Sequence, residues 1–262
     1  MPTALTIGGS DSGGGGGVQA DLKTFAAFGV YGTCAVTAIA AKNTVGVTAF
    51  EPLSADLVTA QMEAVASDIG VDAVKTGLLA SAAIVEVVAA GIDSLELPFV
   101  VVDPEIIARS GERVVPEDAE AALRAELLPR TYVVTPSLPE AERLAGMRIA
   151  NLEDAREAAR RIQTLGPSAV VIKGGHRAQA EVIDLLFDGR DFVELRSPRV
   201  DTQHTQGRGA TFAAALAAGL ALGRALRGAA LEAEEYVAGA VRHGLDLGRG
   251  QGPLDHFWRS VR

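Results

Sequence analysis

The sequence has a single cysteine and no long hydrophobic run. Cys34 alone cannot form a disulfide within the chain. The longest nearly apolar run, from Ala210 to Leu222, is too short to span a bilayer. Met1 to Gly8 lacks a basic start and a cleavable apolar stretch, so nothing there suggests export. We therefore expect a cytoplasmic protein without a membrane segment.

The chain also lacks a surplus of positive charge. It carries 33 acidic against 24 basic residues, a net charge of −9, and no lysine- or arginine-dense patch interleaved with aromatic residues. We expect a small-molecule partner and no nucleic acid. Hydrophobic residues at 48% and charged residues at 22% are typical of a globular protein with a large core. The length of 262 residues is compatible with one domain over 1–262, which we predict.

Several common catalytic signatures are absent. The Walker pattern is absent, and G-x-G-x-x-G fails because Val18 stands where the third glycine of the N-terminal loop would be. The segment Gly8 to Ser12 lacks the final glycine of a nucleophile elbow. The histidines lie too far apart in sequence to form a short metal-binding motif, so we expect no structural metal. They are His176, His204, His243 and His256.

A polar, glycine-broken turn leads directly into a small-residue helix between Asp201 and Gly223. Gly207 and Gly209 allow sharp bending and close approach of a ligand. The start of the following helix offers unpaired N–H groups and a partial positive charge, to which Arg208 adds a full one. The turn therefore indicates an anion site, although an ordinary glycine turn would give the same local pattern.

The N-terminal region contains a second glycine-rich turn, within Gly8 to Thr24. It follows the apolar run Ala4–Gly8 and precedes an amphipathic segment that ends at Phe28, an order that predicts strand, loop and helix. Five consecutive glycines, Gly13 to Gly17, are costly to order. Close approach to a ligand would compensate for this cost; a flexible linker is the alternative.

Apolar strand-like runs then alternate with helical segments. This alternation predicts an α/β fold with a mostly parallel central sheet of at least six strands and helices on both faces. Val47–Leu53 is predicted as a strand for which an antiparallel orientation is open, and Val182–Phe187 with Phe192–Arg196 as a hairpin. Because ligands bind beyond the carboxyl ends of parallel strands, we expect the strand-end residues to converge on one edge. These are Gly8 to Asp11, Gly77, Asp103, Thr135 to Ser137 and Lys173 to His176.

Taken together, these motifs resemble those of the hydroxymethylpyrimidine and phosphomethylpyrimidine kinases of thiamine biosynthesis, within the ribokinase-like superfamily. The resemblance covers nearly the whole chain. Its motifs, in order, are GGSDSGGGGGVQADLKTFAAFGVYGT at Gly8 to Thr33, NTVGV at Asn43 to Val47, KTGLL at Lys75 to Leu79, VVVDP at Val100 to Pro104 and VVIKGGH at Val170 to His176.

The resemblance implies a ribokinase-like fold, ATP and Mg²⁺ as cofactors, a pyrimidine substrate and a homodimer. It places the substrate against Gly9, Asp21, Lys42, Asn43 and Leu78. It places the nucleotide against Lys173, Gly175, His176, Thr205 and Ser137. The transferring phosphoryl group faces Gly207, Arg208, Gly209 and Ala210, and Asp103 and Glu140 are candidates to hold Mg²⁺ through water. Ordinary structural roles remain open for three of these residues: a loop cap for Asp103, a helix-face position for Glu140 and a surface ion pair for Lys173.

The chain departs from the family pattern at four places. Ala210 stands where the family has a cysteine and related enzymes have an aspartate base. Lys42 replaces a glutamine or glutamate, and could pair with Asp21 or meet a substrate phosphate. Ser137 replaces an asparagine, and Glu105-Ile106 replaces Val-Met.

Two functions follow from these departures. The first is an ATP-dependent kinase of a hydroxymethylated pyrimidine or a related ring such as pyridoxal, with low turnover because alanine cannot accept a proton. The second is a kinase-like module that binds such a ligand or a nucleotide in a regulatory role.

Overall fold

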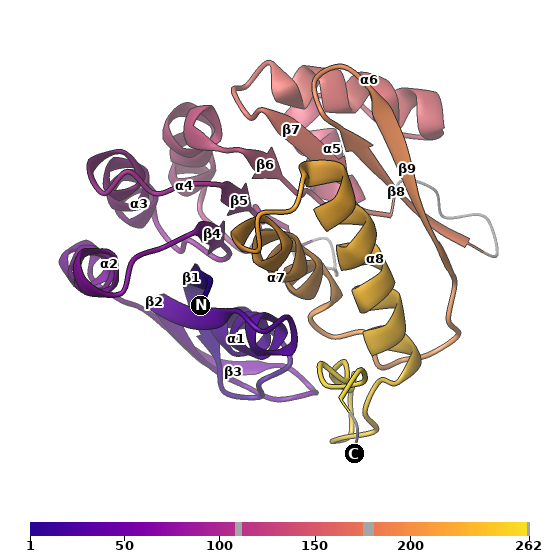
Figure 1. Ribbon diagram of the computed structural model, residues 1–262, viewed down its shortest axis with the longest axis horizontal. Coiled ribbons are helices and arrows are strands. Elements are labelled where there is room, and N and C mark those ends of the chain that lie inside the picture. Colours follow the sequence, from indigo (N-terminus) through magenta and orange to yellow (C-terminus); the bar gives the residue numbers. More distant parts are fainter. Residues whose placement is uncertain (108–111, 175–180, 261–262) are drawn as a thin grey trace.

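The computed structural model describes residues 1–107, 112–174 and 181–260, which form a nine-stranded sheet in the order β3-β2-β1-β4-β5-β6-β7-β8-β9 (Figure 1). The strands are β1 (Thr3–Asp11), β2 (Tyr31–Lys42), β3 (Val47–Pro52), β4 (Ala73–Thr76), β5 (Val100–Val102), β6 (Val133–Val134), β7 (Ala169–Ile172), β8 (Glu181–Phe187) and β9 (Phe192–Pro198). The α-helices are α1 (Gly17–Ala27), α2 (Ala55–Asp68), α3 (Ala82–Ser94), α4 (Glu117–Ala122), α5 (Leu138–Ala145), α6 (Leu152–Gln163), α7 (Arg208–Ala221) and α8 (Leu226–Arg242). A π-helical turn (Leu123–Leu127) and a 3₁₀ turn (Leu128–Arg130) continue α4.

The central strands run parallel, as the alternation predicts. Strands β2, β1, β4, β5, β6 and β7 are parallel neighbours, whereas β3, β8 and β9 are antiparallel. Unbroken valine runs such as Val100–Val102 suit strands that are buried on both faces. The antiparallel β3 and the β8–β9 hairpin confirm the corresponding expectations.

Helices cover both faces of the sheet, which confirms the predicted layering. Helices α2 to α6 pack on one face with Val102, and α1, α7 and α8 pack on the other with Val101. Successive side chains of a strand point to opposite faces, so Val100 and Val102 pack in the first core and Val101 packs in the second. Ser54 caps α2 by accepting a hydrogen bond from the Leu57 N–H.

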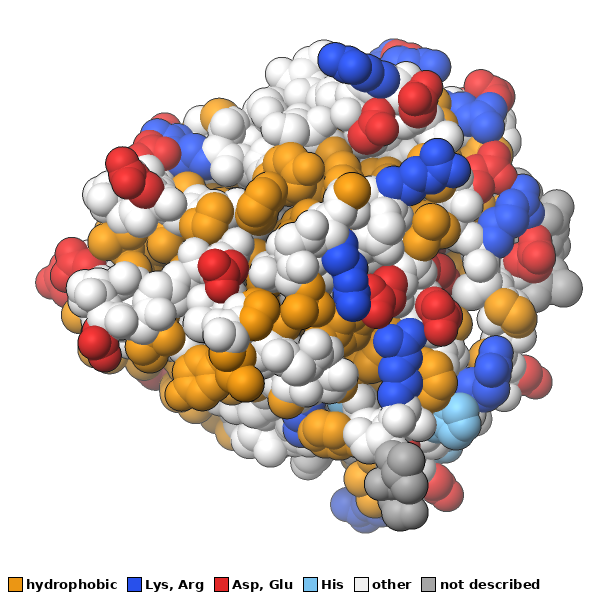
Figure 2. All heavy atoms as spheres, in the orientation of Figure 1, with side chains coloured by type: hydrophobic (Ala, Val, Ile, Leu, Met, Phe, Trp, Pro, Cys, Tyr) orange, Lys and Arg blue, Asp and Glu red, His pale blue; other side chains and the backbone are white. Residues whose placement is uncertain are grey.

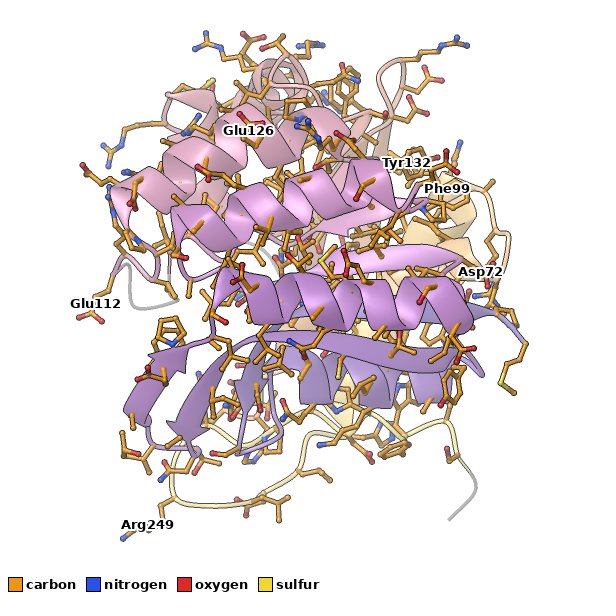
Figure 3. The ribbon with its side chains drawn as sticks, turned by 90° about the vertical axis from the view of Figure 1, so that its left-hand side faces the viewer. Asp72, Phe99, Glu112, Glu126, Tyr132 and Arg249 are labelled. Carbon is orange, nitrogen blue, oxygen red and sulfur yellow. The ribbon has the colours of Figure 1, made fainter. Side chains whose placement is uncertain are left out.

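The strand order reverses between β1 and β4, and this determines where a ligand can bind. The chain runs from β1 to β2 and β3 on one side and then crosses to β4 on the other. Figure 3 shows Asp72, Phe99 and Tyr132, which precede β4, β5 and β6, at one edge, and Glu112 and Arg249 at the opposite edge. The carboxyl ends of the parallel strands lie at that second edge, where open α/β sheets bind ligands.

The first strand is longer than the sequence suggests. The apolar run predicts a strand that ends at Gly8, but β1 continues to Asp11, because the long β2 offers it partners. A bulge between Gly8 and Gly9 shifts the register, after which Asp11 pairs with Ala40. Only the residues from Ser12 to Gly16 form the loop before α1.

The surface agrees with a chain that carries charges of both signs. Lysine and arginine side chains are interspersed with acidic ones over α6 and β9 in Figure 2. No helix within the described ranges is long and apolar enough to cross a bilayer.

Candidate functional site

The two glycine-rich turns contact each other directly. Gly207 has φ = 83°, and a Cβ at this position would overlap the carbonyl oxygen of Gly15. A Cβ on Gly15 would in turn meet the Gln206 side chain at 3.0 Å. Residues about 190 positions apart thus form one wall of the same edge, and the glycines are required because of this close approach.

Asp11 organises the N-terminal loop. One carboxylate oxygen accepts the Gly13 N–H at 2.9 Å and the other accepts the Gly16 N–H at 2.9 Å. Its side chain is buried, and a loop of glycines gains a fixed shape from these two charge-assisted bonds. These two hydrogen bonds therefore offset part of the conformational entropy that is lost when the glycine run is ordered.

Lys42 lies beside Asp11, so the possible pairing with Asp21 is wrong. Its Nζ is 3.3 Å from the Asp11 carboxylate, and its side chain is 30% exposed. The Ser12 hydroxyl also donates to the Lys42 carbonyl oxygen at 2.7 Å. The extension of β1 carries Asp11 alongside the end of β2, and this register brings the two charges together.

Asp21 is paired with a lysine that our sequence analysis did not assign to the site. The Lys75 Nζ donates to its carboxylate at 2.9 Å, and the Thr6 hydroxyl donates to the same oxygen at 2.6 Å. Both charged side chains are 1% exposed. Asp21 Oδ1 has no hydrogen-bond partner among the described residues. An unpaired buried carboxylate oxygen is unfavourable, so this atom is the one available to a ligand.

Lys75 stays a cation because acids surround it. Burial alone would lower its pKa, but the carboxylates of Asp21, Glu105 and Asp103 raise the pKa above its usual value. Burial raises the pKa of Asp21, and Lys75 opposes that rise. Burial also raises the pKa of Glu105 to about 7. Glu105 has φ = 45°, a left-handed conformation that is strained for a residue with a Cβ.

A second lysine lies where the C-terminal turn begins α7. Lys173 Nζ donates to the Asp103 carboxylate at 2.7 Å. A Cβ on Gly209 would be only 3.0 Å from Lys173 Nζ, so the absent side chain leaves the first turn of α7 open to the lysine. Lys173 thus forms the ion pair at the sheet edge that was one of its two predicted roles, and its Nζ also lies near the first turn of α7.

Glu140 has a structural role that any metal ion would have to share. It forms a capping box at the start of α5, in which one oxygen accepts from the Ser137 N–H at 2.8 Å and from the Ser137 hydroxyl at 2.7 Å. The other oxygen accepts from the Ile106 N–H at 2.9 Å. Burial and then Asp103 raise the pKa of Glu140.

Magnesium fits this donor set only in an indirect arrangement. The described residues contain no group of three or more acidic, histidine or cysteine ligands suited to a metal ion. Mg²⁺ in kinases usually keeps several waters and uses one or two carboxylates together with phosphates. Asp103 and Glu140, already occupied by hydrogen bonds, are compatible with contact through water.

The remaining predicted substrate residues fall into two groups. Gly9 and Leu78 touch: a Cβ on Gly9 would be 3.5 Å from Leu78 Cδ2, at the switch point between β1 and β4. Asn43 is exposed instead, and its side-chain oxygen accepts from the N–H groups of Val45 and Gly46 at 2.8 and 3.2 Å. Asn43 thus closes the β2–β3 turn.

The predicted nucleotide residues are only partly described. Gly175 and His176 lie outside the described residues. Thr205 is half-buried in the C-terminal turn, and its carbonyl accepts from the Arg208 N–H at 3.4 Å. Ala210 is 8% exposed in the first turn of α7.

Two charged residues at this edge have roles that the sequence does not predict. Asp11 is expected only as one of the strand-end residues, and Lys75 only as part of the KTGLL motif. The signal for Lys75 was present, because a lysine inside the short buried strand AVKT requires a partner in the interior.

Comparisons with known proteins agree with this geometry. A family model described as phosphomethylpyrimidine kinase matches residues 11–255. The hydroxymethylpyrimidine/phosphomethylpyrimidine kinase of Bacillus subtilis is 46% identical over 255 residues, which covers 97% of this chain and 94% of that protein. The fold is similar to that of Bacillus subtilis pyridoxal kinase solved as an ADP complex, with a TM-score of 0.93, 38% identity and complete coverage of both chains. A phosphomethylpyrimidine kinase from Clostridium difficile gives a TM-score of 0.83 at 37% identity, over 92% of this chain and 100% of that one.

Proposed function

The chain belongs to the phosphomethylpyrimidine kinase family, and on that premise we propose that it transfers the terminal phosphoryl group of ATP to hydroxymethylpyrimidine or its monophosphate. The observation that carries the proposal is the meeting of Lys173, Asp103 and the open first turn of α7 at Gly209. Phosphoryl transfer depends mainly on positioning and on neutralising phosphate charge, and this edge supplies a cation and oriented N–H groups for both tasks.

The nucleotide phosphates are proposed to lie between Lys173 and the start of α7. The N–H groups of Gly209 and Ala210 lie in the first helical turn and have no acceptor one turn earlier within α7. They would hold the phosphoryl group that moves, while Thr205, Ser137, Gly175 and His176 would contact the rest of the nucleotide. Mg²⁺ held through water by Asp103 and Glu140 would neutralise phosphate charge.

The pyrimidine ring is proposed to bind at the switch point, against Gly9 and Leu78, with Lys42 and Asn43 at the rim. Asp21 Oδ1 is the acceptor left for a ring substituent, because its neighbouring oxygen already binds Thr6 and Lys75. A substrate oxygen then attacks the terminal phosphorus: the hydroxyl oxygen of the free alcohol, or a phosphate oxygen of the monophosphate. The new O–P bond forms as the bond to the ADP oxygen breaks, and the proton of the alcohol leaves to water.

Slow turnover is part of the proposal. The methyl side chain of Ala210 cannot take the proton of an attacking hydroxyl, and general base catalysis typically contributes about 10²- to 10⁴-fold. Arg208 and Lys173 still offer charge stabilisation. The wild type should therefore bind ATP normally and phosphorylate the pyrimidine slowly.

Replacing Ala210 by cysteine is expected to raise turnover by at least about tenfold, the lower part of the range for a general base. The helix N-terminus raises the thiolate fraction of a cysteine placed there, and the position already accommodates a Cβ. ATP affinity should remain nearly unchanged. Steady-state assays with hydroxymethylpyrimidine, its monophosphate and pyridoxal, together with ATP titration, measure both effects.

An Ala210→Ser variant is the matched control, since it adds a side chain of similar size with a much weaker acid, and it should gain little. If the cysteine variant binds ATP but phosphorylates none of the three compounds, the chain acts as a binding module instead. If the wild type already turns over as fast as the cysteine variant, the reaction does not need a general base at position 210.

We also propose that the chain forms a homodimer through β3. All six residues of this edge strand are exposed, including Val47 and Phe50, and Ile39 of β2 is exposed beside them. An unpaired apolar edge favours association with another strand, here that of a second copy. Sedimentation equilibrium should give twice the chain mass, and Phe50→Glu should give the monomer; a monomeric wild type at micromolar concentration would rule the dimer out.

A further inference from the structure

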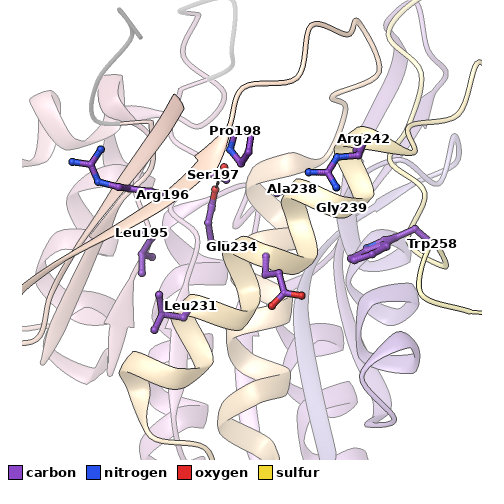
Figure 4. Close-up of a pocket in the computed structure, with 11 residues that line it drawn as sticks. Leu195, Arg196, Ser197, Pro198, Leu231, Glu234, Ala238, Gly239, Arg242 and Trp258 are labelled. Carbon is purple, nitrogen blue, oxygen red and sulfur yellow. Dashed lines mark hydrogen bonds between the residues drawn. The ribbon is translucent and has the colours of Figure 1, made fainter. Parts of the chain in front are cut away.

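A buried carboxylate lies behind the phosphate-facing turn. Glu234, in the middle of α8, is 3% exposed and accepts the Ser197 hydroxyl of β9 at 2.5 Å on Oε1 (Figure 4). The guanidinium of Arg208 approaches the same oxygen at 3.8 Å. Within the described ranges, Glu234 Oε2 has no hydrogen-bond partner. Glu234 therefore connects the core of α8 to the first residue of α7.

The surroundings of Glu234 favour its neutral form. Burial comes first, then the nearby Asp184 of β8, and together they raise the pKa of Glu234 to about 7 against the opposition of Ser197 and Arg208. Asp184 is 2% exposed and accepts the Gly174 N–H at 2.5 Å.

Solvent can supply the proton. Glu234 lines a cavity of about 250 Å³ between α8 and β9, which is open enough for several waters. Glu235, Arg196 and Arg242 are the other charged side chains that line it. A proton can thus reach Glu234 through this cavity, which is not lined by any described residue of the proposed nucleotide site.

Arg208 is placed to leave Glu234 when an anion arrives. It follows Gly207 directly and is the first residue of α7, whose N-terminus faces the proposed phosphates. Its side chain is 35% exposed, so it can reorient, and 3.8 Å is a long contact for an ion pair. Phosphate charge attracts the guanidinium and, at the same time, disfavours a carboxylate behind it.

We propose that Glu234 is a positioning residue for Arg208: it holds the guanidinium against α8 in the free protein and takes up a proton when bound phosphates draw the guanidinium away. The proposal rests on the proposed kinase function, because it needs a nucleotide at the start of α7. It makes nucleotide affinity dependent on pH in a defined direction, since a ligand that raises the proton affinity of a group binds more tightly at lower pH.

Calorimetric titration with Mg·ADP tests the proposal. Titrations near pH 7 in two buffers of different ionisation enthalpy give the number of protons taken up. Wild type should take up a few tenths of a proton more than Glu234→Gln. Between pH 6 and pH 8 the ADP affinity of wild type should fall about fivefold more than that of the variant, as expected for a tenfold increase in proton affinity on binding. Protonation of ADP itself is common to both proteins and cancels.

Glu235→Gln is the matched control. This neighbouring acid is exposed and pairs with Arg259 at 3.2 Å, so its variant should behave like wild type. Arg208→Ala provides a second route if Glu234→Gln fails to fold, because Glu234 without its cation should already be protonated near pH 7 and the extra uptake should vanish.

Equal proton uptake by wild type, Glu234→Gln and Arg208→Ala would overturn the proposal and leave the kinase function standing. Failure of all these proteins to bind Mg·ADP would overturn both.

Discussion

Replacing Lys75 by methionine is expected to lower the free energy of unfolding by about 3–5 kcal/mol, the usual cost of leaving one charge of a buried ion pair without its partner. Lys75 and Asp21 are each 1% exposed and 2.9 Å apart, so water cannot replace the lost cation. At the size of this chain the loss corresponds to a fall in melting temperature of roughly 10 °C. Denaturant unfolding and calorimetry measure it.

A matched surface change isolates the effect of burial. Arg130 pairs with Asp93 at 2.7 Å, but the two side chains are 29% and 57% exposed, so Arg130→Met should cost no more than about 1 kcal/mol. Adding Asp21→Asn to Lys75→Met removes the orphaned charge and should recover about 1–3 kcal/mol. The double variant should regain stability without gaining kinase activity, because Asp21→Asn changes the group that is proposed to accept from the substrate. If Lys75→Met is as stable as wild type, the pair of Lys75 and Asp21 does not contribute to stability as expected.

Replacing Gly207 by alanine is expected to reduce kcat/KM by about 10²-fold or more. The new Cβ would overlap the Gly15 carbonyl, and a left-handed backbone is strained for alanine. The two glycine turns must then separate, and a displacement of about 1 Å at a catalytic site can cost 10²-fold. Because the turns lie at the rim of the sheet, the variant should remain folded. Steady-state kinetics and circular dichroism distinguish lost activity from lost structure.

Gly146→Ala is the control for backbone strain. Gly146 ends α5 with φ = 64°, and a Cβ there would meet no atom within 4 Å. Its variant should lose about 1 kcal/mol of stability and keep normal kinetics. If Gly207→Ala and Gly146→Ala have the same kcat/KM, the contact between the turns is unimportant for catalysis.

The arrangement of the sheet could be predicted because it depends on patterns that are local in the sequence. Runs such as Val100–Val102 have no polar alternation, which indicates strands covered on both sides, and helical segments of suitable length separate them. The boundaries of β1 could not be predicted in the same way. Gly9 to Asp11 are extended only because β2 lies alongside, and glycine itself does not favour a strand.

The site was predicted residue by residue more reliably than it was predicted pair by pair. Asp103 and Lys173 were expected at the strand ends and Gly209 in the turn before the C-terminal helix, and the structure brings the three together. The partner of Lys42 was not foreseen, since a shift of one residue in strand register changes which carboxylate it meets. Glu234 gave no signal at all, because a glutamate on a helix is usually exposed and only tertiary packing buries it.

The contact between Gly15 and Gly207 also sets an order of events during synthesis. A ribosome that adds about 5–20 residues per second needs roughly 10–40 s to extend the chain from the first of these glycines to the second. The hydrogen bond of Thr44 forms later still, because its carbonyl accepts the Gln251 N–H from the loop that follows α8. Nascent chains can therefore form β1, β2 and β4 early, yet they lack one of the two glycine turns of the proposed nucleotide site until almost the whole chain has emerged. A chain whose synthesis stops before Gly207 should therefore lack kinase activity, because the second glycine turn is missing. No separate inhibitory segment is required.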